Sequence, residues 1–368
     1  FIPSAGFAFH SSTKAINVFA FTSATLSLGP VEFSLNKMGF EVGLKNKPGL
    51  WDLEGLELVA DLVAPSGVGI KIRSENITGG GFLEFNSPNY SGVLELSLQD
   101  KFDLAAFGLL TTDLPDGKDG FSLIVQIMAE FDAVQLGLGF ALEGVGGIIG
   151  INRRIHEDNL RKAVFANEIE LFPKRPVKDA YKLTSSLDRF FPAEDGSYVF
   201  GPALKMFWGG SNRIVNFEVG VFVQLGRAKR VALVGFANSH LPNKEKALVV
   251  LDFEVSGFLD LTNQRLVVDG SLEKTSRLLN FKLDGSFAIR MAWGKEKYFV
   301  LSVGGFNPKF KGAPTGFPEL RRAAMAWGGN NVKFNLESYF AITPNTLQFG
   351  ASFYLHASRF GGSITGES

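Results

Sequence analysis

Residues that could carry acid–base or metal chemistry are few and widely separated in this chain. The four histidines are His10, His156, His240 and His356, and no two have the close spacing of a His-x-x-x-His metal site. Cysteine is absent, which excludes disulfides, thiolate metal sites and cysteine nucleophiles. The Gly-x-Ser-x-Gly motif of many serine hydrolases is absent too. We therefore expect no metal, no other cofactor and no enzymatic activity.

One pair of carboxylates has a spacing used in catalysis. Glu130 and Asp132 lie two residues apart, which places both on one face of an extended strand. Paired carboxylates on a concave sheet hydrolyse glycosidic bonds, so a carbohydrate-active β-sandwich enzyme is one alternative function. Any alternating strand produces such pairs, however, and the chain has only 4 Trp and 6 Tyr with which to stack on sugars.

The glycine-rich segment FALEGVGGIIGINRR (residues 140–154) has three possible interpretations: a phosphate-binding loop, part of a membrane span, or a bend between packed strands. A dinucleotide-binding loop needs a third glycine where Ile149 stands, and a helix that begins directly after the loop. A membrane helix would place Glu143 and many glycines inside the bilayer. We therefore expect a strand, a bend at the glycines and a second apolar segment.

The elements that must position these residues are predominantly β-strands. Apolar residues recur at every second position, which places them on one face of a strand. The longest example runs from Leu279 to Trp293 and predicts one strand, or two strands joined at Gly285. Further alternating segments cover residues 215–225, 249–255, 332–336 and 347–355. Short polar turns separate the segments, so we expect antiparallel meanders.

Composition limits the classes of partner. The 37 basic and 37 acidic residues give a net charge of zero, which argues against nucleic acid as a partner. Phenylalanine is abundant, with 36 residues, and its side chain has no polar group. The alternating segments also resemble those of an outer-membrane barrel, but the scarce Trp and Tyr predict no aromatic girdle, so a membrane is not an expected partner. Composition leaves the compartment open between cytoplasmic and secreted.

Residues 155–191 depart from the alternating pattern. Segments 156–166 and 179–191 have helical periodicity, and Pro173, Pro176 and Pro192 flank them. The sequence thus predicts a first antiparallel β region over residues 1–150, a helical, proline-rich insert over 151–197, and a second antiparallel β region over 198–368. We expect a mainly β fold, a large curved antiparallel sheet that is sandwich-like or groove-like.

Several segments together resemble the bacterial family known as domain of unknown function 6603. They are IRSENITGGGFLEF (72–85), GFSLIVQIMAEF (120–131), FALEGVGGIIGINR (140–153), FVLSVGGFNPKF (299–310) and YFAITPNTLQFGASFYLHA (339–357). The resemblance implies a mostly β module of long bacterial proteins that usually continue beyond the point where this chain stops, so we expect a C-terminal truncation. It implies no activity for any residue.

Two non-enzymatic functions follow from the apolar strand faces. If the faces pack fully, we expect a structural or assembly module whose partners are other domains of the same long chain or separate assembly partners. If the faces stay apart, a Phe-lined groove would bind a lipid or acyl chain. The residues that we expect to contact such a ligand are Phe217, Phe253, Phe281, Phe287, Phe349 and Phe353.

Overall fold

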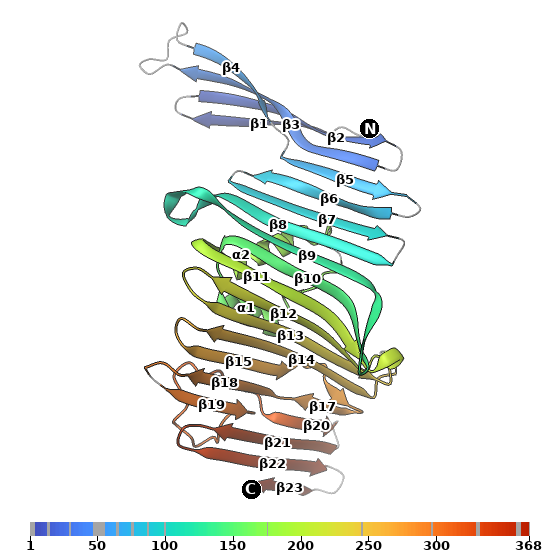
Figure 1. Cartoon of the computed structure of the whole chain (residues 1–368), viewed down its shortest axis with the longest axis vertical. Helices are drawn as coiled ribbons and strands as arrows, with labels where there is room; N and C mark the ends of the chain where they lie inside the picture. Colours follow the sequence, from blue (N-terminus) through green and yellow to red (C-terminus); the bar gives the residue numbers. More distant parts are fainter. Residues whose placement is uncertain are drawn as a thin grey trace. The chain divides into compact units, whose positions relative to one another are not determined.

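A computed structural model describes residues 4–12, 15–28, 31–46, 56–63, 66–74, 77–86, 88–98, 101–174, 176–243, 246–295, 297–328, 332–357 and 362–367. The chain divides into two compact units. Unit 1 comprises Phe1–Ala129 and Lys174–Leu187, and unit 2 comprises Glu130–Pro173 and Asp188–Ser368. Each unit is mainly β, and the strand pairings found in the described residues are antiparallel, as predicted (Figure 1).

Unit 1 is a meander of adjacent strands. Its elements are β1 (Ser4–Ser12), β2 (Ala15–Leu28), β3 (Val31–Asn46), β4 (Leu56–Val63), β5 (Gly67–Arg73), β6 (Ile77–Asn86), β7 (Asn89–Leu98), β8 (Phe102–Leu114), a 3₁₀ turn η2 (Pro115–Gly117) and the first part of β9 (Lys118–Gly137). Strands β5, β6 and β7 each pair with the next strand in sequence. Strand β3 is long enough to pair with β4 through residues 39–46 and with β5 through residues 31–36.

Unit 2 holds the rest of β9 and a longer series of strands. The strands are β10 (Phe140–Arg153), β11 (Ala193–Trp208), β12 (Val215–Leu225), β13 (Arg230–Leu241), β14 (Val249–Asp260), β15 (Arg265–Leu272), β16 (Arg277–Leu278), β17 (Phe281–Asp284), β18 (Ser286–Ala292), β19 (Tyr298–Val303), β20 (Ala323–Gly328), β21 (Val332–Ile342), β22 (Leu347–Ala357) and β23 (Gly362–Glu367), with a 3₁₀ turn η3 (Gly210–Asn212). Strands β10 to β15 form an uninterrupted antiparallel meander.

The predicted insert contains the two α-helices of the described chain, α1 (Glu157–Phe165) and α2 (Ala180–Phe190). Helix α1 begins at His156, whose Nδ1 accepts a hydrogen bond from the Asn159 N–H at 3.3 Å. Glu157 and Asp158 lie in its first turn, where the helix dipole favours negative charge. Neither helix is long and apolar enough to cross a bilayer.

The structure corrects one predicted segment and confirms the division of another at Gly285. The segment 140–153 forms one strand, β10, with a bulge between Leu142 and Gly144, where we expected a bend between two segments. Glycine is needed in it because a Cβ at Gly147 would lie 2.6 Å from the Gly201 carbonyl oxygen of β11. Gly285, with φ of 155°, separates β17 from β18, and the two strands then pair with different partners, β20 and β15.

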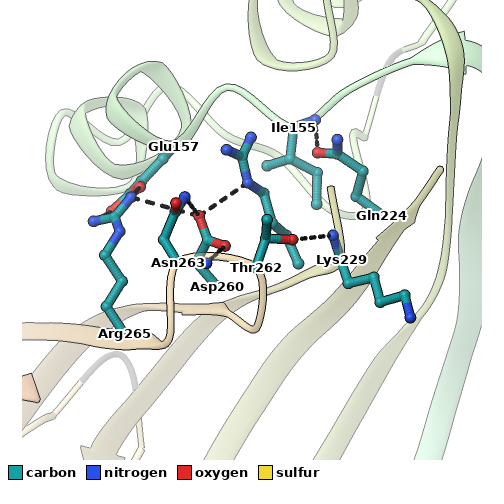
Figure 2. Close-up of polar contacts among 9 residues, drawn as sticks. Ile155, Glu157, Gln224, Lys229, Asp260, Thr262, Asn263 and Arg265 are labelled. Carbon is teal, nitrogen blue, oxygen red and sulfur yellow. Dashed lines mark hydrogen bonds and ion pairs between the residues drawn. The ribbon is translucent and has the colours of Figure 1, made fainter. Parts of the chain in front are cut away.

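A polar network fixes α1 against the sheet of unit 2 (Figure 2). Helix α1 lies against β14, and its residue Glu157 forms an ion pair with Arg265 at the start of β15. The Ile155 N–H donates to the buried Gln224 Oε1 at 2.9 Å. Since backbone groups removed from water must find partners, Gln224 is what allows the chain to enter α1 at a buried position.

Asp260, at the end of β14, is the most heavily bonded acid in this network. It accepts hydrogen bonds from the Asn263 N–H at 2.9 Å and from Arg230 Nε at 3.1 Å. Burial alone would raise the pKa of this carboxyl, but the hydrogen bonds from Asn263 and the charge of Arg230 outweigh it, so the pKa lies below its ordinary value.

Replacing Asp260 with Asn removes a charge that Arg230 and the β14–β15 turn require. We expect D260N to lower the free energy of unfolding by about 1.5–3 kcal/mol, the range for hydrogen bonds to charged groups. The contribution of Asp260 is present above its unfolded pKa and disappears as the pH falls through the lower folded pKa. Urea denaturation at neutral and acidic pH measures both effects.

The matched control is Asp195→Asn, because Asp195 and its partner Arg227 are both partly exposed, whereas Asp260 is buried. Its change in unfolding free energy should stay within about 1 kcal/mol. Equal effects of the two variants would contradict the role given to Asp260.

Candidate hydrophobic-ligand site

The sheet of unit 1 has two chemically different faces. On one face, Val93, Phe107 and Ile124 are buried, and Glu95 of the same face accepts a hydrogen bond from the Val177 N–H at 3.5 Å. Val177 therefore contacts this face. The strand registers place the intervening residues on the opposite face, which we call the apolar face of unit 1. It includes Val68, Ile70, Gly81, Leu83, Gly92, Leu94, Ala106, Gly108, Leu110, Leu123 and Val125.

A groove of about 670 Å³ lies on the apolar face of unit 1. Its lining comes from five strands, β5 to β9. At a spacing of about 4.8 Å between neighbouring strands, the groove is roughly 19 Å long. Leu83 and Leu94 in its lining are 55% and 36% exposed, although both are large apolar side chains. The groove is thus an apolar surface that faces solvent.

Glycines shape this part of the sheet. Gly81, Gly92 and Gly108 occupy positions of the apolar face on three consecutive strands. A Cβ at Gly81 would lie 2.3 Å from the Val93 carbonyl oxygen, and one at Gly108 would lie 2.8 Å from the Ile124 carbonyl oxygen. Only glycine permits the neighbouring backbone to approach so closely. The same positions leave open space over the strands, where larger side chains would fill the groove.

Charged side chains are absent from the groove surface formed by the described residues. Glu84 is the only charged residue of the lining, and its register places it beside Ser91 on the opposite face, where Ser91 Oγ donates to Glu84 Oε2 at 3.5 Å. Tyr90 is the one residue of the apolar face in this lining that carries a polar group on its side chain. The site therefore favours an occupant that is apolar along its length.

Unit 2 repeats the same two-faced arrangement. One face is buried beneath α1 and includes Phe222, Ala232 and Phe258. The other, the apolar face of unit 2, crosses β10 to β15, β18, β19 and β21 without a charged side chain. Its members include Val145, Ile149, Phe200, Leu204, Val219, Val223, Leu233, Val255, Leu259, Val268, Ile289, Met291, Phe299, Leu301 and Phe340.

Three of the six phenylalanines expected to contact a ligand, Phe217, Phe253 and Phe287, lie on the apolar face of unit 2. The other three lie on other strands of unit 2, Phe281 on β17 and Phe349 and Phe353 on β22. The structure brings some of the six together. Phe253 and Phe287 stack with ring centroids 6.1 Å apart. They cover Gly270, at which a Cβ would lie 2.2 Å from the Phe287 ring. The rings of Phe281 and Phe353 both pack against the ring of Phe334, with centroid distances of 5.8 and 5.4 Å. Phe217 and Phe349 lie apart from these groups, and Phe349 is 77% exposed.

Sequence reasoning did not identify the groove of unit 1. The available signal was the recurrence of glycine at apolar-face positions of consecutive strands, as in Gly79, Gly81 and Gly92. Glycine in an alternating segment has no side chain to count, so periodicity alone gave these strands less weight than the Phe-rich ones.

The other candidate residues have structural partners. Glu130 forms an ion pair with Lys205, and Asp132 is exposed. His156 caps α1, His240 lies 3.8 Å from Asp252, and His356 stacks on Tyr354. The side chain of His10 falls outside the described part of the structure. Within the described residues, no group of three His, Asp or Glu side chains has the geometry of a metal site.

Sequence comparison agrees with the resemblance stated above. No curated protein matches the chain. A family model for DUF6603, a family of unknown function, matches residues 2–367, which is nearly the whole chain. The chain therefore belongs to the DUF6603 family.

Proposed function

We propose that this chain is a non-catalytic module that binds the acyl chain of a lipid or fatty acid in the groove of unit 1. The supporting observation is the groove itself, about 670 Å³ in volume and lined by apolar side chains and glycines of five strands. Pockets of roughly 300–1,000 Å³ are the usual size for small-molecule ligands. The proposal extends the expectation of an apolar groove from the Phe-rich strands to a different part of the chain.

An acyl chain fits the chemistry of the groove better than a sugar or a peptide does. Backbone groups of β5 to β8 are paired within the sheet, and among the described residues no charged side chain faces the groove. A sugar or an extended peptide would leave hydroxyl or amide groups without partners, at a cost of about 1–3 kcal/mol each. An acyl chain has no such groups.

The expected affinity follows from the length of buried chain. Each buried methylene contributes about 0.8 kcal/mol. Ten buried methylenes would give about 8 kcal/mol, close to a dissociation constant of about 1 μM before the cost of ordering the chain. Because ordering the chain adds a further cost, we expect a dissociation constant no lower than about 1 μM.

The test places a charge in the groove. Leu94 lies on the apolar face of β7, opposite Ala106 of β8, and is already partly exposed, so Leu94→Glu should fold. We expect the parent chain to bind the fluorescent fatty acid cis-parinaric acid at micromolar concentration and L94E to bind it at least about tenfold more weakly, since a carboxylate in an apolar site costs more than about 1.4 kcal/mol.

The control is Ser97→Glu, which adds the same charge to the opposite face of the same strand. S97E should bind the probe like the parent. Failure of the parent to bind, or equal loss in both variants, would contradict the proposed site.

A second candidate function has its own supporting observation. The apolar face of unit 2 extends over nine strands, about 38 Å at the usual spacing. With about six residues of each strand in contact, its area is on the order of 800 Å², which is what each partner of a stable dimer buries. We propose that this face packs against a second copy of the chain, as an assembly module would.

Ile149 provides a test of assembly because it is 60% exposed and lies at this face beside Phe200. We expect the parent chain to dimerise and I149E to be monomeric in light scattering coupled to size-exclusion chromatography. Tyr181→Glu is the control, because Tyr181 is 84% exposed on α2 and belongs to unit 1, whereas the face belongs to unit 2. A parent chain that stays monomeric at high micromolar concentration would contradict self-assembly and leave the acyl-chain proposal intact.

A further inference from the structure

The turn between β9 and β10 presents large apolar side chains to solvent. Leu138 in this turn is 94% exposed, and Val134 and Leu136 in the strand that leads to it are exposed as well. Phe140 and Trp208 lie exposed directly behind the turn. We call these five side chains the apolar tip. They belong to unit 2, so the apolar tip is separate from the acyl-chain groove of unit 1.

The apolar tip has apolar side chains on both sides of the hairpin. Strand β9 ends at Gly137 and β10 begins at Phe140, so a two-residue turn joins them and these two residues lie opposite each other. Since successive residues point to opposite sides, Leu136 projects from one side and Phe140 from the other. Phe140 pairs with Trp208 of β11, and their ring centroids are 6.4 Å apart. A contact through one face of the sheet would therefore leave part of the tip uncovered.

Hydrogen bonds within the chain satisfy the carbonyl groups of the turn. Trp208 Nε1 donates to the Leu138 carbonyl oxygen at 3.1 Å, and the Gly209 N–H donates to the Gly139 carbonyl oxygen at 3.0 Å. Carbonyl groups that enter hydrocarbon need such partners, because no water is there to replace them. Both carbonyl groups of the turn meet this condition.

The fold alone does not explain a leucine in this turn. Leu138 has a φ of 51° and Gly139 a φ of 84°, both in the left-handed region. Two-residue turns of this kind favour Asn, Asp or Gly at the first position, because most side chains with a Cβ are strained there. Almost all of the Leu138 side chain faces solvent, so burial within the chain does not offset the strain. Its presence points to an apolar partner outside the chain.

A lipid bilayer fits the apolar tip better than a protein partner does. Each side of a stable protein complex contributes about 20–30 residues, and the tip has only five side chains. A bilayer needs no matching surface, and it accepts the segment 133–142 because no charged residue occurs there. Tryptophan is enriched where a bilayer meets water, which suits Trp208 behind the turn.

We propose that the apolar tip inserts into one leaflet of a lipid bilayer, with Leu136 and Leu138 among the acyl chains and Trp208 near the headgroups. Glu143 follows Phe140 by three residues, so it lies roughly 10 Å further back along the strand. Its ion pair with Arg213, at 2.6 Å, then stays in the polar region when the tip enters by about 5–10 Å. The few Trp and Tyr of the whole chain counted against a membrane partner, but a single hairpin needs only the tryptophan at its base.

Flotation of the whole chain with phosphatidylcholine vesicles tests the insertion. We expect the parent to float at about 1 mM lipid, with an association constant on the order of 10⁴ M⁻¹, similar to that of a single acyl anchor. Leu138→Asn removes the leucine but suits the turn. It should bind at least about tenfold more weakly, because burial of a leucine is worth more than a factor of ten, while its urea midpoint equals or exceeds that of the parent.

The matched control is Leu261→Asn. Leu261 is 49% exposed in the β14–β15 turn, at the opposite end of the strands of unit 2. L261N should float like the parent. A parent chain that does not float, or equal flotation of the parent and L138N, would overturn the proposal.

A fluorescent label at the turn distinguishes a bilayer from a protein partner. The chain has no cysteine, so Leu138→Cys carries the fluorophore NBD at a single position. Its emission should rise when phosphatidylcholine vesicles are added and should be quenched by lipids with a doxyl group on the acyl chain. The same label on Leu261→Cys should show neither change. An emission at position 138 that rises with protein concentration and does not respond to vesicles would assign the tip to a second copy of the chain and contradict insertion.

Discussion

The alternation of side chains along an extended strand is the constraint on which this structure depends. Successive residues of a strand point to opposite faces, so a sheet with an apolar residue at every second position presents a continuous apolar face that must be shielded from water. Each unit here has two faces of different character. In unit 2, helix α1 covers one face, and in unit 1, Val177 contacts one face. On the opposite faces, Ile149 of unit 2 and Leu83 and Leu94 of unit 1 remain substantially exposed.

The covered face of unit 2 carries several buried charged groups. Asp260, Asp269 and Glu254 lie there, with arginines from the sheet and from α1 as partners. Burying a charge costs free energy, and removing one partner of an ion pair leaves the other charge buried without compensation. Such networks therefore fix the positions of the elements that contribute to them. The apolar face has no such network, and its contacts are made between neighbouring side chains such as Phe253 and Phe287. The polar network thus fixes the positions of α1 and the strands on the covered face, whereas the other face keeps its apolar surface available.

Much of the fold was predictable because it follows from local periodicity. The alternating segments at residues 215–225, 249–255 and 347–355 are strands β12, β14 and β22, and the helical periodicity of residues 156–166 is α1. Two features were not predictable. The segment 140–153 was expected to bend at its glycines, yet Gly147 serves the close approach of β11 instead. The groove of unit 1 was missed because glycine contributes nothing to an apolar count although it creates the space.

The central claim is that an apolar sheet face in this chain is open to an apolar ligand. Native mass spectrometry of the intact chain, purified without detergent and incubated with palmitic acid, tests this claim most directly. The groove predicts a complex whose mass exceeds that of the chain by at least one palmitate and which survives gentle desolvation. A spectrum that shows the ligand-free mass alone at saturating palmitate would contradict the account, because it would mean that the exposed Leu83 and Leu94 do not line a usable site.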